Sequence, residues 1–186
     1  SQKNKKNPIL WFGKSQMSGD KIFLTSDIKT KKLDSLKIIG NSWIIERDSI
    51  SDTGFNQIKG GVLDGLFKEG ELREIDVSKN TEVIYYMYSD EDNKLIGIDK
   101  TTCSRLKMVT NENQIEDITF FVSPDGNLFP DKDLPLNERK LEGFIWREYE
   151  RPNNILELFS EEDNQFQPTE IREVIIPEDF LQKTEQ

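Results

Sequence analysis

Apolar and polar residues in the first 130 positions follow a pattern that recurs three times. The segments 33–41, 72–80 and 115–123 each carry apolar residues at their positions 1, 4 and 6, and a polar, turn-forming residue at position 9. Successive segments are offset by 39 and 43 residues, a difference that one lengthened hairpin loop accounts for. A period of this size indicates stacked repeat units rather than an irregular fold.

The stretches between these segments predict strands joined by hairpins. Residues 58–67 and 95–109 each lead through a Gly or Asn turn signal into the next repeated segment. Leu106 and Met108 alternate with charged neighbours, which is typical of a half-buried strand. Residues 83–88 are apolar on both alternating faces, so we expect a strand that is buried on both sides or lies at an interface. The predicted fold class is therefore all-β, a repeat-built antiparallel jellyroll of stacked strands.

The character of the chain changes near residue 130. Prolines punctuate the polar stretch that follows, and the apolar cluster of residues 141–146 stands out within it. We interpret residues 1–130 as the β-repeat domain and residues 131–186 as a Pro-rich C-terminal arm that packs on the domain or extends from it. Phe144 and Trp146 either anchor a partner or fix the arm to the sheet.

The composition of the chain limits which kinds of partner and functional site we expect. The chain has 186 residues, a formal net charge of −10, no His and a single cysteine, Cys103. A charge of this sign argues against a nucleic-acid partner. Because the chain has no His, it lacks the commonest general base and the commonest metal ligand. It also has no imidazole that could activate the Cys103 thiol. The acidic run 89–94 lacks the spacing of a calcium loop and predicts a solvated hairpin. We expect no catalytic residue, no metal and no cofactor.

Several motifs occur in an order that resembles one known family. Gly40-Asn41 precedes the run 56–60, which is followed by Gly65-Leu-Phe67 and then by the segment 72–77. This succession resembles the repeat of the OstA/LptA lipopolysaccharide transport family. Residues 84–86, 95–98 and 144–152 resemble the version found in Bacteroidetes-type bacteria, and the likeness spans roughly residues 20–152.

The resemblance implies a twisted β-jellyroll that is open along one side. It implies a periplasmic or outer-membrane-associated module of a Gram-negative cell, which binds the lipid A acyl chains of lipopolysaccharide and bridges toward the outer membrane. Its other expected partners are further transport jellyrolls joined edge to edge, or copies of itself. The polar N-terminus contains no signal-length apolar stretch, so we expect the signal of an exported protein to have been removed.

Inward-facing apolar residues would line the lipid groove, although the same residues can simply pack against one another. The candidates are Trp43, Ile45, Ile58, Leu63, Phe67, Ile75, Val77, Val83, Tyr85, Leu106, Met108, Ile118 and Phe120. Two alternatives stay open. One is a structural or adaptor module that binds proteins by strand addition without lipid, and the other is a carbohydrate-active enzyme on a stacked β scaffold.

Overall fold

The computed structural model describes residues 7–51, 53–111 and 114–153, and divides the chain into two units, Ser1–Arg147 and Glu148–Gln186. The second unit contributes only residues 148–153 to the description, including the 3₁₀ turn η3 (Glu148–Glu150). Most of the arm predicted over 131–186 therefore lies outside the described residues. No helix in the described ranges is long and apolar enough to cross a membrane.

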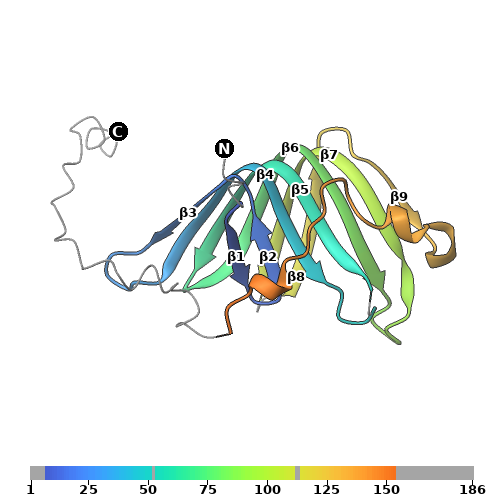
Figure 1. The fold of residues 1–186 in the computed structure, drawn as a ribbon, viewed down its shortest axis with the longest axis horizontal. Coiled ribbons are helices and arrows are strands. Elements are labelled where there is room, and N and C mark those ends of the chain that lie inside the picture. Colours follow the sequence, from blue (N-terminus) through green and yellow to red (C-terminus); the bar gives the residue numbers. More distant parts are fainter. Residues whose placement is uncertain (1–6, 52, 112–113, 154–186) are drawn as a thin grey trace, which may run out of the picture. The chain divides into compact units, whose positions relative to one another are not determined.

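The first unit is built on one antiparallel β-sheet, which confirms the predicted all-β, jellyroll-like fold (Figure 1). The strands follow the order β1-β2-β4-β5-β6-β7-β8, while β3 pairs with β4 and β9 with β7. The short 3₁₀ turns η1 (Asp131–Asp133) and η2 (Leu136–Glu138) follow the sheet. The strands are β1 (Ile9–Phe12), β2 (Ser15–Ser18), β3 (Lys21–Ser26), β4 (Leu33–Arg47), β5 (Phe55–Lys68), β6 (Glu71–Tyr88), β7 (Leu95–Asn111), β8 (Gln114–Phe121) and β9 (Asp125–Phe129).

The four long strands β4 to β7 bend near their midpoints, and the bends lie at the same level across the sheet (Figure 1). The ninth residue of each repeated segment forms such a corner. Asn41, Asn80 and Ser123 have φ values of 47°, 59° and 51°, and the residue before each is also at positive φ. Two consecutive left-handed residues turn the strand sharply without reversing it. The predicted turns at position 9 are therefore corners, at which β4 and β6 continue and β8 gives way to β9.

The neighbouring strands bend where a small residue permits close approach. A Cβ atom on Gly60 would lie 2.5 Å from Val77 Cγ1, and one on Gly19 would lie 2.3 Å from Ile38 Cγ2. Val77 and Ile38 occupy position 6 of their repeated segments, so the same contact recurs in successive repeats. Gly at these positions lets a large core residue sit directly beneath the corner.

The corners divide the sheet into two halves, here called limb A and limb B. Limb A comprises β3, β8 and residues 33–39, 62–68, 71–78 and 105–111. Limb B comprises β1, β2, β9 and residues 42–47, 55–59, 81–88 and 95–103.

The inner faces of the two limbs pack on each other. One buried cluster joins Leu36, Val77 and Leu106 of limb A to Ile44 and Val83 of limb B. Residues from both sides of the corner can share a cluster only if the sheet folds back over itself. The predicted alternation in 83–88 is confirmed, because Val83 contacts this cluster while Ile84 and Tyr86 belong to a second one on the outer face of limb B.

Residues 131–147, here called the strap, cover that outer face. Leu134 and Leu141 are buried in the second cluster, and Phe144 and Trp146 pack against it. The Phe144 ring lies 5.1 Å from the ring of Phe55, in an edge-to-face arrangement. Leu141, Phe144 and Trp146 of the predicted apolar cluster thus contact the sheet, whereas Ile145 is 62% exposed.

Two buried glutamines attach the strap through its main chain. Gln57 Nε2 donates to Arg139 O at 2.8 Å, and Gln57 Oε1 accepts from Leu141 N at 2.9 Å. Gln16 repeats the arrangement, donating to Ile145 O at 2.9 Å and accepting from Arg147 N at 2.7 Å. A side-chain amide offers the same donor and acceptor pair as a peptide group, so each glutamine binds the strap as a neighbouring strand would.

Candidate functional site

A cavity of about 590 Å³ lies between the inner faces of the two limbs, at the ends farthest from the corners. Its lining comes from the β1–β2 turn, from β4, β5 and β6, from the end of β7 and from the start of β8. A volume of this size falls within the range of small-molecule sites. The cavity is the principal candidate site because it combines this volume with a mostly apolar wall.

The wall of the cavity is formed by large apolar side chains. Met17, Ile58, Ile75 and Met108 lie deep in the wall, each at most 5% exposed. The remaining apolar lining residues are Phe12, Ile44, Leu72, Tyr85 and Ile115. Two methionines make such a wall adaptable, since their unbranched side chains adjust to irregular shapes.

The interior is closed on the corner side and open at the other end. Toward the corners, Leu36, Ile38 and Leu106 are at most 1% exposed. At the far ends, an edge-to-face contact between Phe12 of limb B and Phe67 of limb A, with ring centroids 5.6 Å apart, joins the two limbs on one side. Two exposed lining residues mark the mouth at these ends, namely Ile115 of limb A, which is 40% exposed, and Lys14 in the β1–β2 turn of limb B.

Polar groups gather at this mouth. Lys14 and Glu46 are the charged residues among those that line the cavity. Ser15 Oγ donates to Glu46 Oε2 at 2.7 Å, so part of the carboxylate is already engaged. Asn56 Oδ1 accepts a hydrogen bond from Tyr86 N at 2.9 Å. This bond uses the carbonyl oxygen of the Asn56 amide and does not involve its NH₂ group. The lining thus contains one cation, Lys14, and one carboxylate, Glu46, which is partly engaged by Ser15.

Tyr85 of β6 lines the cavity, and its hydroxyl is the only phenolic group among the lining residues. Burial raises the pKa of Tyr85, and the nearby carboxylates of Glu46 and Asp48 raise it further. Both effects penalise the phenolate, so the hydroxyl stays protonated at neutral pH. It is available there as a hydrogen-bond donor to a bound molecule.

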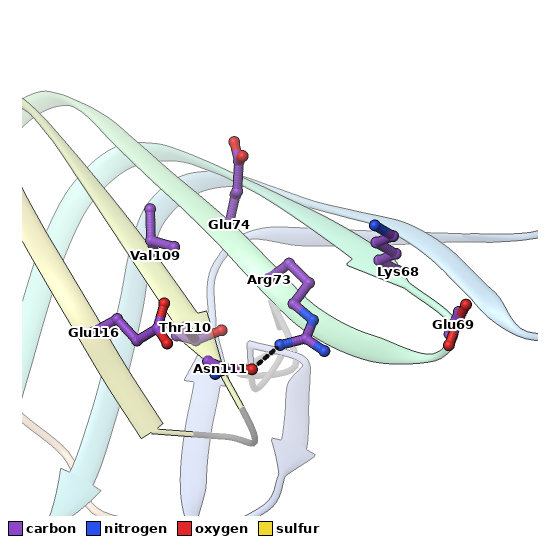
Figure 2. Close-up of a pocket in the computed structure, with 8 residues that line it drawn as sticks. All are labelled: Lys68, Glu69, Arg73, Glu74, Val109, Thr110, Asn111 and Glu116. Carbon is purple, nitrogen blue, oxygen red and sulfur yellow. Dashed lines mark hydrogen bonds between the residues drawn. The ribbon is translucent and has the colours of Figure 1, made fainter.

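A second depression, of about 560 Å³, lies on limb A near the β5–β6 and β7–β8 hairpins (Figure 2). Lys68, Glu69, Arg73 and Glu74 line it, and the Arg73 guanidinium hydrogen-bonds to Asn111. Figure 2 shows these long side chains spread along the strands rather than converging on one point. It is a shallow, charged surface and offers neither an apolar wall nor a grouped set of catalytic side chains.

The structure brings only some of the predicted groove residues together at the cavity. Ile58, Ile75, Tyr85 and Met108 line it. Others pack in the closed part of the same core, where Ile118 and Phe120 are partly buried; this second group consists of Leu63, Phe67, Val77, Val83, Leu106, Ile118 and Phe120.

The prediction that Trp43 and Ile45 face the groove is wrong. Both belong to the outer cluster beneath the strap. Ile44, between them, points inward and lines the cavity, so its neighbours on the same strand must point outward.

Five apolar lining residues were missed by sequence reasoning. Leu72 and Ile115 occupy position 1 of the second and third repeated segments, so the repeat itself offered a signal. Ile44 follows from the inward position of Leu36 and Ile38 along β4, where the corner preserves the alternation. Phe12 and Met17 belong to the short strands β1 and β2, which precede the first repeated segment and share none of its pattern.

Cys103 lies in the closed core, 8% exposed, and its thiol donates to Arg105 O at 3.2 Å. Burial raises the pKa of Cys103, which keeps it in the unreactive thiol form. Within the described ranges, no group of His, Cys, Asp or Glu is arranged to hold a metal ion.

No protein-family model, curated protein or solved structure matches this chain. The function is accordingly inferred from the cavity and from the strand edges of the sheet.

Proposed function

We propose that this protein is a periplasmic, OstA-like module that binds lipopolysaccharide through its acyl chains during transport to the outer membrane. The observation that carries the proposal is the apolar cavity that opens between the two limbs. The order of the motifs around Gly40-Asn41, Gly65 and Phe67 supports it, since these residues lie in the strands that build the cavity and its floor.

The energetics favour a hydrocarbon ligand. Burying a methylene group is worth about 0.8 kcal/mol, so a chain of about twelve methylenes gains roughly 10 kcal/mol before the cost of association. The wall residues Ile58, Ile75 and Met108 offer contact area and few competing polar atoms. A polar metabolite placed against this deep wall would find little there to replace its hydration.

The strand edges support assembly with further jellyrolls. β3 and β8 are the outer strands of limb A, and each pairs on one side only within the described sheet. Antiparallel alternation from β3 to β8 makes these two strands run in opposite directions. β3 of one copy can thus pair with β8 of another and continue the antiparallel order, which extends limb A and the interior beside it.

Photocrosslinking tests the lipid proposal directly. A photoreactive amino acid at Ile115, in the mouth, should crosslink to lipopolysaccharide in Gram-negative cells. The same group at Ile96 is the matched control, because Ile96 is 55% exposed and does not line the cavity. Crosslinking at neither position, or equally at both, would overturn the proposal. Val83 is unsuitable for substitution by Asp, since it is 1% exposed and the variant would unfold.

A second candidate, an adaptor module without lipid, rests on β3. Phe23 and Leu24 are 50% and 45% exposed on this edge strand, which is unusual for a strand that meets only solvent. The adaptor function predicts a concentration-dependent oligomer that is lost in Phe23→Lys and Leu24→Lys, with no lipid crosslink in any variant. Sedimentation velocity measures the first, and the crosslinking experiment above measures the second.

A further inference from the structure

We infer that the cavity accepts one acyl chain at a time, and that Lys14, Asn56 and Tyr85 at its mouth bind oxygen atoms of the group that carries this chain. The inference rests on the proposed function and specifies its ligand. It concerns the number of chains inside the protein and the chemistry of the part that stays at the mouth.

The volume sets the number of chains. A methylene group is close in size to a water molecule, whose share of the liquid is roughly 30 Å³. The cavity of about 590 Å³ therefore holds on the order of 20 carbon atoms, which is one long chain. A lipid with several long chains would place one of them in this cavity, because all of them together would need several times this space.

The surrounding core prevents the cavity from growing toward the corners. Leu63, Val77 and Val83 are each 1% exposed, and Leu106 is fully buried. Close-packed side chains of this kind leave no room for a second chain without separating the limbs. Separation is opposed by the Phe12–Phe67 contact across the far ends.

The polar groups at the mouth favour an oxygen-rich acceptor. The Tyr85 hydroxyl is protonated, and Lys14 is an exposed cation with no ion pair among the described residues. Asn56 keeps its amide hydrogens for a ligand, because its carbonyl oxygen is used by Tyr86 N. The facing acceptor, Glu46, is partly occupied by Ser15. Donors thus outnumber available acceptors, which suits a carboxylate, ester or phosphate and disfavours a quaternary ammonium group.

A chain-length series tests the number of chains. Saturated fatty acids of increasing length would be measured by displacement of a fluorescent fatty acid from the full chain. We expect affinity to rise about fourfold per methylene and to stop rising at a length on the order of 20 carbons. Ile115→Trp should bring the plateau to a shorter length, whereas Ile96→Trp should leave it unchanged.

Two results would overturn the single-chain inference. One is an affinity that rises without a plateau, and the other is a two-chain phospholipid that binds much more tightly than the single-chain lipid with the same head group. Crosslinking of lipopolysaccharide at Ile115 separates this failure from that of the proposed function. Crosslinking without a plateau retains the function and rejects the inference, while a plateau without crosslinking rejects lipopolysaccharide and retains a single-chain ligand.

Charge reversal at the mouth tests the head group. Lys14→Glu should weaken fatty acid binding about fivefold, in keeping with a solvent-exposed ion pair, and should leave the plateau length unchanged. Lys132→Glu, an exposed lysine outside the cavity lining, makes the same change in net charge and should have no effect. An alkyl trimethylammonium of equal length should bind more weakly than the fatty acid. Equal binding of the two head groups, or equal effects of the two lysine variants, would contradict the assignment.

Discussion

Limb A and limb B share one set of strands and one line of corners, yet their outer faces differ in kind. The outer face of limb A is solvated and carries ion pairs across neighbouring strands, including Lys37–Asp64 at 2.6 Å and Lys107–Glu74 at 2.9 Å. The outer face of limb B carries a buried apolar cluster that lies beneath the strap, although Lys59 and Glu82 also pair there at 3.2 Å. Limb A is half-buried, whereas limb B is the middle layer between limb A and the strap.

The difference is encoded within single strands. In β6, residues 74–77 alternate between outward charged and inward apolar positions, while residues 83–88 are apolar in both directions. A strand with one apolar face needs one covering layer, and a strand with two needs both. The cavity opens between a limb that is held on both faces and one that is held on its inner face alone.

The largest effect should come from truncating the outer face of limb B. Ile84→Ala should lower the free energy of unfolding by about 2–5 kcal/mol, because Ile84 is fully buried under the strap. Leu66→Ala on the outer face of limb A should cost less than about 0.5 kcal/mol, since Leu66 is 55% exposed. Chemical denaturation measures both. Similar costs would show that the two faces do not differ.

The next largest effect on stability should come from removing the Gln57 amide, which attaches the strap to the sheet. Gln57→Leu keeps the volume but leaves Leu141 N and Arg139 O without their side-chain partner, which should cost about 2 kcal/mol. The strap should then be cleaved faster by trypsin at Arg139 and Lys140. Unchanged cleavage in the variant would mean that these hydrogen bonds do not hold the strap in place.

Alkaline pH should weaken limb B selectively. Burial raises the pKa of Tyr88, and a hydrogen bond to Asp48 raises it further; burial likewise raises the pKa of Tyr85 and Tyr86. All three lie in limb B. Because the folded pKa exceeds the ordinary value of about 10, the associated stability is fully present below pH 10 and is lost as the pH rises above it.

The dependence can be measured as the midpoint of denaturation between about pH 9 and pH 12. Tyr88→Phe should reduce the slope over this range, because the phenylalanine has no proton to lose. A slope that is unaffected by the substitution would show that the Tyr88 hydroxyl does not titrate above its ordinary range.

The smallest effect should come from the ion pairs on limb A. A double-mutant cycle on Lys37 and Asp64 should give a coupling of about 0.5 kcal/mol, since both side chains are 49% exposed. The coupling should vanish in about 1 M salt, where charges are screened within roughly 3 Å. A coupling above about 2 kcal/mol that resists salt would mean that the outer face of limb A is not solvated.

The repeat and the strand content could be predicted because they are local patterns. Apolar residues at positions 1, 4 and 6 place Leu36, Ile38 and Val77 in the core, and position 9 marks each corner. The sequence does not show that the chain bends at Asn41 and Asn80 rather than reversing, because left-handed residues occur in both geometries.

Which face a residue occupies was harder to predict. A bulge at Gly60 and Gly61 shifts the alternation, so that Ile58 and Leu63 share the inner face despite an odd spacing. The attachment of the strap was equally hidden, since Gln16 and Gln57 bind main-chain atoms more than 80 positions away and have no local signature. The cavity mouth likewise emerges only when the β1–β2 turn, which lies outside the repeat pattern, is placed beside β4.

Native mass spectrometry of the protein purified from a Gram-negative envelope tests the central claim most directly. An apolar interior that is accessible between the limbs predicts a retained acyl amphiphile, seen as added mass on the protein. The added mass should fall in Ile115→Trp, which narrows the mouth, and persist in Ile96→Trp. Bare protein in every sample, or equal retention in both variants, would contradict an interior that opens at this mouth.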